Sequence, residues 1–229
     1  MGAEPRNGGG FNAMAYLSGA AGAVAMSLVV VDIGPPPVGP ARMSGSHTSL
    51  IADSYVQAIA WMLILWFIAT LRAHMFSSEG GAGRLSSLVL GGGIALCTLG
   101  VLAAAFRAAG SGPELGQAQV TGNVIPYNSD LLSYIANHVL SFASLPGVVM
   151  MTAACLLSLR FKVLPVALGY SAGVIALLGA LASFSVFYDS RVLGPGGMPT
   201  MLALWAFIAW IFATSLTLTF RSRGTTLPR

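Results

Sequence analysis

Residues 129–142, SDLLSYIANHVLSF, begin the stretch of sequence that decides the fold. They contain the beginning of a longer run, residues 131–159, in which 29 residues include no Lys, Arg, Asp or Glu. A helix of that length extends about 43 Å, because each residue adds ~1.5 Å, and this exceeds the ~30 Å of hydrocarbon in a bilayer. The run therefore predicts a transmembrane helix.

Five other stretches lack charged residues in the same way: 7–31, 54–71, 85–106, 163–188 and 192–220. Of the 229 residues, 55% are hydrophobic and only 8% are charged, whereas about a quarter of a soluble domain is charged. Strand-like alternation is absent, and a helix satisfies its own backbone groups in lipid. We predict an all-α polytopic membrane protein with one domain, residues 1–229, and six transmembrane helices at about 12–32, 50–72, 85–107, 131–159, 163–188 and 198–220.

The basic residues predict the orientation of these helices, because short cytoplasmic loops carry an excess of Lys and Arg. Three of the eleven, Arg42, Arg107 and Arg191, fall on one side of the predicted bundle. The other eight fall on the opposite side: Arg6, Arg72, Arg84, Arg160, Lys162, Arg221, Arg223 and Arg229. Both termini are therefore expected in the cytoplasm. The net charge of +4 reflects these anchors, and no nucleic-acid partner is expected, since no basic run is interleaved with aromatics.

The helix at 131–159 carries a polar stripe that lipid alone would not favour. Asp130, Tyr134, His138 and Ser141 recur at helical spacing, with Asn137 beside them. The eleven residues from the first to the last extend about 16 Å along the axis. We expect this stripe to face the bundle interior and to line a water-accessible cavity that opens to the outside.

Other predicted helices place polar and aromatic groups at a similar level. A charged group that faces lipid is costly, so these groups are expected to turn inward or to pair. The expected pairs are Asp53 with Arg107 or Arg191, and Asp130 near His138. The candidate catalytic residues are Asp53, His138 and Asp189. The candidate substrate-binding residues are Gln57, Trp61, Asp130, Tyr134, Asn137, Ser141, Tyr188, Arg107 and Arg191.

A structural role is the alternative for several of these residues. Asp53 and Asp130 lie near helix N-termini, where a carboxylate caps orphan N–H groups. No closely spaced metal-ligand motif and no cofactor-binding motif is present, so no metal and no cofactor are expected.

Small residues at regular spacing predict close helix packing. Gly91, Ala95 and Gly100 lie on one predicted helix, and Gly169, Gly173, Ala176 and Gly179 on another. Such faces pack neighbouring helices of the same chain, and they also offer a surface for a homo-oligomer.

Two stretches carry a family resemblance: LILWFIATLRAHM at 63–75 and LRFKVLPVALGYSAGVIALLG at 159–179. With the six-helix layout, they make the chain similar to a broad family of bacterial, mostly actinobacterial, hypothetical integral membrane proteins. The resemblance implies a multi-pass protein of the bacterial plasma membrane and no particular activity. In size and placement of acids, the chain also resembles small integral membrane terpene cyclases, as an analogy only.

These features predict an outward-facing intramembrane pocket for a lipophilic small molecule. In the first hypothesis the pocket is an acid–base catalyst of the cyclase, isomerase or hydrolase type, in which a protonated Asp donates and His138 or a second carboxylate accepts. The alternative is a non-enzymatic binding or accessory membrane subunit. A small transporter is the third hypothesis.

Overall fold

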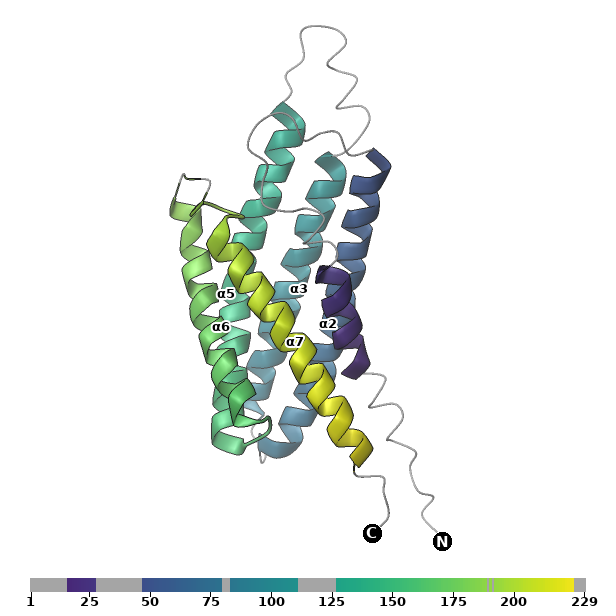
Figure 1. Ribbon diagram of the computed structural model, residues 1–229. Helices are drawn as coiled ribbons and strands as arrows, with labels where there is room; N and C mark the ends of the chain where they lie inside the picture. The colour runs from purple at the N-terminus through teal and green to yellow at the C-terminus, as the bar shows by residue number, and fades with distance from the viewer. Residues whose placement is uncertain are drawn as a thin grey trace, which may run out of the picture.

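The computed structural model describes residues 16–27, 47–79, 83–110, 127–188, 190 and 192–224, with the side chains of 47–50, 127–130 and 222–224 excepted. Within these residues all regular secondary structure is helical (Figure 1). Residues 16–27 form a helical stretch. The other elements are α2 (His47–Glu79), α3 (Arg84–Gly110), α5 (Tyr127–Phe161), α6 (Val166–Phe184), the short 3-10 helix η2 (Ser185–Phe187) and α7 (Met198–Gly224).

Five helical spans in the described part of the chain are long and apolar enough to cross a membrane. They are Ile51–Glu79, Arg84–Gly110, Leu131–Phe161, Val166–Phe187 and Met198–Arg221. Each coincides with one predicted span, so these five predictions are confirmed as long apolar helices. The predicted span at 12–32 is helical at residues 16–27, and its ends lie outside the described residues. The five helices give the chain the character of a multi-pass membrane protein.

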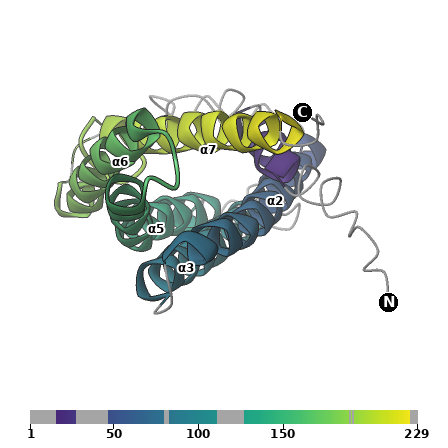
Figure 2. The same ribbon diagram turned by 90° about the horizontal axis from the view of Figure 1, so that it is seen from below.

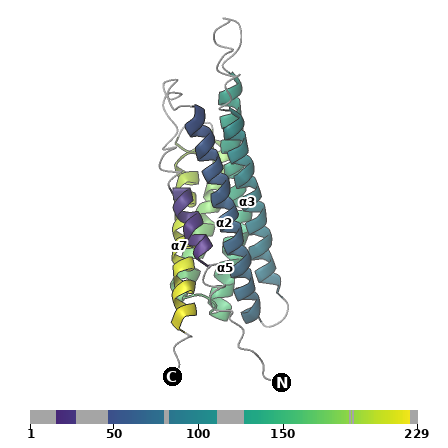
Figure 3. The same cartoon turned by 90° about the vertical axis from the view of Figure 1, so that its right-hand side faces the viewer.

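Successive helices run in opposite directions and are neighbours in space (Figures 1 and 3). We call the end at which α2, α5 and α7 begin the upper end, and the end at which they finish the lower end. Residues 16–27 run antiparallel to α2, because Gly19 packs on Phe67 while the ring of Tyr16 meets the ring of His74, 6.5 Å away between centroids. Residue 16 therefore lies toward the lower end.

Seen from below, α5 lies between α3 and α6, while α7 closes the bundle from the α6 side toward residues 16–27 (Figure 2). The oblique path of α7 lets its two halves contact different helices. Near its lower end the hydroxyl of Ser215 donates to the carbonyl of Tyr16 and accepts from the backbone N–H of Ala20 at 3.1 Å. These bonds fix residues 16–27 against α7.

Glycines let α3 approach its neighbours closely. Of the predicted face, Gly100 is buried against a neighbour, whereas Gly91 and Ala95 are exposed, so the prediction is wrong for these two. A Cβ placed on Gly92 would lie 2.7 Å from the carbonyl oxygen of Pro146, so the backbones of α3 and α5 touch there. The helix α5 is nevertheless continuous through Pro146. Gly169, Gly173 and Gly179 of α6 likewise face α5. These glycine faces are thus used within the chain, and a homo-oligomer through them stays a prediction.

The turn between α2 and α3 is held by a carboxylate at the lower end. Glu79 accepts backbone hydrogen bonds from Leu85 at 2.9 Å and Ser86 at 3.1 Å. These donors belong to the first turn of α3, where N–H groups have no partner within the helix and the helix dipole is positive. Glu79 therefore caps α3 from the preceding helix.

The charged side chains of the described residues are distributed unevenly between the two ends. Asp53 lies near the beginning of α2 and Arg107 near the end of α3, and both positions are toward the upper end. Six lie toward the lower end: Arg72, Glu79, Arg84, Arg160, Lys162 and Arg221. Five of these six are basic, as the positive-inside pattern requires of a single membrane face.

Candidate functional site: an apolar cavity below a polar layer

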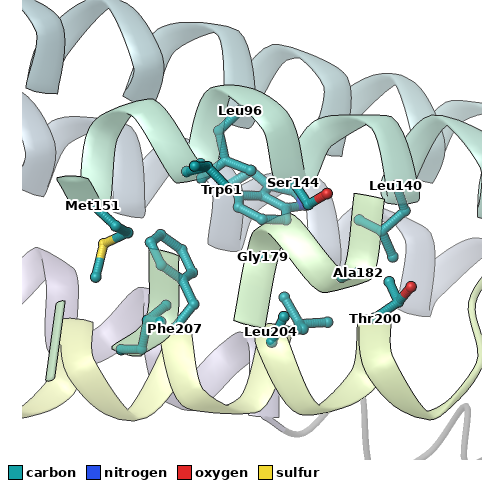
Figure 4. Close-up of a pocket in the computed structure, with 14 residues that line it drawn as sticks. Trp61, Leu96, Leu140, Ser144, Met151, Gly179, Ala182, Thr200, Leu204 and Phe207 are labelled. Carbon is teal, nitrogen blue, oxygen red and sulfur yellow. The ribbon is translucent and has the colours of Figure 1, made fainter. Parts of the chain in front are cut away.

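A cavity of about 60 Å³ lies between α2, α3, α5, α6 and α7. Its wall is almost wholly apolar and includes Trp61, Leu96, Leu140, Met151, Leu204 and Phe207. Leu204 and Phe207 project from α7 toward the side of the cavity that Trp61 and Leu96 form (Figure 4). The hydroxyl groups of Ser144 and Thr200 add small polar areas to the wall.

The cavity lies deep along the helices. Trp61 comes ten residues after Ile51 and Leu140 nine residues after Leu131, the residues at which the apolar spans of α2 and α5 begin. At ~1.5 Å per residue both side chains are about 14–15 Å from the upper ends of those spans. This is near the middle of a ~30 Å hydrocarbon layer.

The position of Trp61 depends on a glycine of α3. Its indole is 1% exposed and lies against Gly100, where an added Cβ would come within 2.2 Å of the ring carbon Cε2. The indole N–H is buried and has no hydrogen-bond partner among the described residues. Close approach of α2 and α3 thus places a large aromatic wall on the cavity. The predicted pocket residue Trp61 does line a cavity.

Three buried hydroxyl groups meet at the upper side of the cavity. Ser141 of α5, Ser185 of η2 and Thr200 of α7 lie 3.4–3.5 Å from one another. These distances exceed the ~2.8 Å typical of hydroxyl hydrogen bonds, so each contact is weak. The three side chains are 0%, 2% and 4% exposed, which makes the cluster a polar contact between three helical elements inside the bundle.

One turn higher, a guanidinium joins three helices. Arg107 of α3 donates from Nη1 to Oε1 of Gln57 on α2 and from Nη2 to Oδ1 of Asn137 on α5, both at 3.2 Å. Both acceptors are neutral amides. Among the described residues no carboxylate lies within ion-pair distance of this guanidinium. Of the two partners expected for Asp53, Arg107 is therefore wrong, because it reaches the amide one turn deeper on α2, and Arg191 lies outside the described residues.

The segment between η2 and α7 packs against the same amide group. Gly196 has a φ of +75°, a conformation that favours glycine, and a Cβ there would lie 3.1 Å from Cγ of Asn137. The backbone N–H of Met198 donates to the carbonyl of Val192 at 2.9 Å and closes the turn. Asn137 is thus held between Arg107 and this turn.

The predicted polar stripe of α5 divides into an inner and an outer part. Asn137 and Ser141 contact other helices, whereas Tyr134 is 60% exposed. His138 bonds through Nδ1 to the carbonyl of Tyr134 at 2.9 Å, and the two rings lie 4.0 Å apart between centroids. The expectation that Tyr134 faces the interior is wrong, because α7, which contacts Ser141 on the same face of α5 through Thr200, begins below the level of Tyr134.

The other candidate residues do not line the cavity or lie outside the described residues. Tyr188 is 54% exposed. Asp53 is partly buried and has an interaction of its own, and the cavity wall does not include it. Three candidates lie outside what the structure describes: Asp189 and Arg191, and the side chain of Asp130. The structure therefore brings together Gln57, Arg107 and Asn137, and separately places Ser141 beside the cavity.

Sequence reasoning missed Thr200 and most of the apolar wall. Thr200 follows a segment rich in Gly and Pro at the beginning of α7, and an isolated Thr carries no signal of its own. Leu140, Leu204 and Phe207 are typical of any membrane helix, so only the packing of α5 against α7 distinguishes them. Among the described residues, no three His, Cys, Asp or Glu side chains are grouped as they would have to be to hold a metal ion.

Comparisons with protein-family models, with curated proteins and with solved structures give no significant match to this chain.

Proposed function

We propose that the protein crosses the bacterial plasma membrane six times, with both termini in the cytoplasm and the upper end of the bundle outside. Two observations support this proposal. Residues 16–27 run antiparallel to α2, as a first spanning helix would. The described basic side chains other than Arg107 lie toward the lower end, where the positive-inside pattern expects the cytoplasm.

We further propose that the protein binds a lipophilic small molecule in the cavity between Trp61 and Phe207. The observation that carries this proposal is the apolar cavity itself, with Gln57, Arg107 and Asn137 grouped about one helical turn above it. An apolar wall at mid-membrane depth suits an alkyl or ring segment. A polar layer toward the membrane surface suits the more polar end of the same molecule.

A binding protein accounts for this geometry better than an acid–base catalyst. The described residues that line the cavity include no titratable carboxylate, imidazole or amine. His138 bonds to a carbonyl of its own helix, and Tyr134, whose ring lies against it at an angle of 47°, is largely exposed. Proton transfer would need a group within hydrogen-bond reach of the substrate. Binding without chemistry needs only the shape and polarity of the site.

The test uses n-decanol and purified protein in phosphatidylcholine nanodiscs, with thermal unfolding followed by tryptophan fluorescence. A ligand present at ten times its Kd stabilises the native state by about 1.4 kcal/mol. The matched variants are Ala203→Leu, which adds side-chain atoms at the cavity wall, and Ala95→Leu, which adds the same atoms on an exposed face of α3.

We expect decanol to raise the Tm of the wild type and of Ala95→Leu in a saturable manner and to have little effect on Ala203→Leu. Filling the cavity removes the binding space. Filling the cavity is also expected to raise the stability of the unliganded protein. An empty cavity of 60 Å³ lowers the free energy of unfolding by about 1.4 kcal/mol at ~24 cal/mol per Å³, and the added atoms restore part of it. Equal decanol responses in all three proteins would show that the alcohol acts through the bilayer and would refute binding in the cavity.

A further inference from the structure

The polar layer above the cavity contains a cation for which the described residues supply no matching anion. Arg107 has five N–H donors, and among the described residues these donate to the uncharged oxygens of Gln57 and Asn137. Two amide oxygens can satisfy hydrogen bonds, but they do not balance a charge. Within the described residues, no Asp or Glu oxygen approaches this side chain closely enough to pair with it.

The guanidinium lies inside the apolar part of the bundle. Gln57 and Asn137 each come six residues after the beginning of an apolar span, at Ile51 and Leu131. At ~1.5 Å per residue that is about 9 Å below the upper end of those spans. Ionised side chains within membrane spans are costly, and those that are retained commonly mark a pathway or a ligand.

The guanidinium also lies next to the cavity along two helices. On α2, Gln57 precedes the cavity residue Trp61 by four positions, and on α5, Asn137 precedes Leu140 by three. One helical turn is about 5.4 Å. A molecule whose apolar end fills the cavity therefore has its other end within reach of Arg107, past the hydroxyl groups of Ser141 and Thr200.

We propose that the ligand is an amphiphile with one anionic oxygen headgroup, a carboxylate or a phosphate monoester, and that Arg107 is its counter-ion. This inference rests on the proposed function and specifies the substrate class of the same site. Gln57 and Asn137 hold the guanidinium in position from α2 and α5. Its remaining donors then bind the headgroup while Trp61, Leu140 and Phe207 surround the tail.

The experiment compares decanoate, decyl phosphate and decanol, which share one tail and differ in the headgroup, in the phosphatidylcholine nanodiscs described above. Acetate and inorganic phosphate serve as headgroups without a tail. Because a hydrogen bond to a charged group is stronger than one between neutral groups, we expect one or both anionic ligands to reach half-saturation at a concentration about tenfold or more below that of decanol. The tailless anions are expected to have no effect at the same concentrations.

The decisive variant is Gln57→Glu, which keeps an oxygen acceptor for Nη1 of Arg107 and adds a negative charge beside it. It is expected to abolish the preference for anionic headgroups while decanol binding persists. Ser133→Glu adds the same charge at an exposed position of α5 and is expected to leave the preference intact. Arg107→Lys, which keeps the charge, is expected to retain a weaker preference, whereas Arg107→Gln is expected to lose it.

Two results would overturn the inference while leaving the cavity proposal in place. One is equal half-saturation by decanol and by both anionic ligands in the wild type, with all three responses lost in Ala203→Leu. The other is an anionic preference that survives in Gln57→Glu. By contrast, the proposed function itself would be refuted if Ala203→Leu responded to every ligand as the wild type does.

Discussion

The contact between Gly100 and Trp61 allows a quantitative prediction about how the cavity is kept open. A Cβ at Gly100 would lie 2.2 Å from Cε2 and 2.5 Å from Nε1 of Trp61, whereas ordinary contact begins at 3.4 Å. The difference of 1.2 Å for Cε2 (3.4 minus 2.2) has to come from movement of the ring or of α3. Trp61 is 1% exposed, so the free volume available to its ring is the cavity that it lines.

Gly100→Ala is therefore expected to destabilise the protein and to close the cavity. Overpacking of a filled interior typically costs about 1–3 kcal/mol. Alanine has a higher helix propensity than glycine, so the same replacement also stabilises the helix by roughly 0.8–1 kcal/mol. Gly91→Ala on the same helix isolates this second effect, because a Cβ at Gly91 meets nothing within 4 Å.

The assay is thermal unfolding of both variants in nanodiscs, each with and without decanol. At about 2–4 °C per kcal/mol for a chain of this size, the Tm of Gly100→Ala should lie roughly 2–12 °C below that of Gly91→Ala. Decanol should no longer stabilise Gly100→Ala. In the double variant Trp61→Leu/Gly100→Ala, the packing penalty should disappear, because the clashing ring is gone. If Gly100→Ala matches Gly91→Ala in both Tm and decanol response, the close contact does not support the cavity.

Three further predictions concern topology, capping and the imidazole. In a protein without its two native cysteines, an impermeant thiol reagent outside intact cells should label Gln117→Cys and not Ser78→Cys; the reverse pattern would contradict the proposed orientation. Glu79→Ala should lower stability by about 0.5–2 kcal/mol, because Glu79 accepts the N–H groups of Leu85 and Ser86, and unchanged denaturation would show that these bonds contribute nothing. His138→Ala should leave decanol binding unchanged, since His138 bonds within α5; loss of binding in a folded variant would favour the acid–base hypothesis.

The long apolar helices were predictable because hydropathy is a local property of the chain. A charge-free run long enough to span a bilayer satisfies its backbone groups as a helix whatever its neighbours are. The predicted span at 85–107 falls within α3, Arg84–Gly110, and the one at 131–159 within α5, Tyr127–Phe161. The uneven distribution of Arg and Lys between the two ends follows from the same local pattern.

Part of the candidate site was also predictable. Gln57, Asn137 and Arg107 stood out because polar side chains are rare in membrane helices, and the structure places them in contact. Helical spacing alone did not show which of them would meet. The cost of an unpaired charge in lipid favoured Asp53 as the partner of Arg107, although Gln57 lies on the same side of α2 one turn deeper.

The long apolar helices and the uneven distribution of basic residues between their ends were thus determined by the sequence alone, and the tertiary structure decided which side chains meet. Tyr134 and Ser141 share one face of α5, yet the first is 60% exposed and the second is buried, because α7 begins beside Ser141 and below Tyr134. Gly91 and Gly100 belong to one small-residue pattern on α3, yet only Gly100 faces Trp61. Burial depends on where a neighbouring helix begins and how it crosses, and these are relations between distant segments that no local pattern contains.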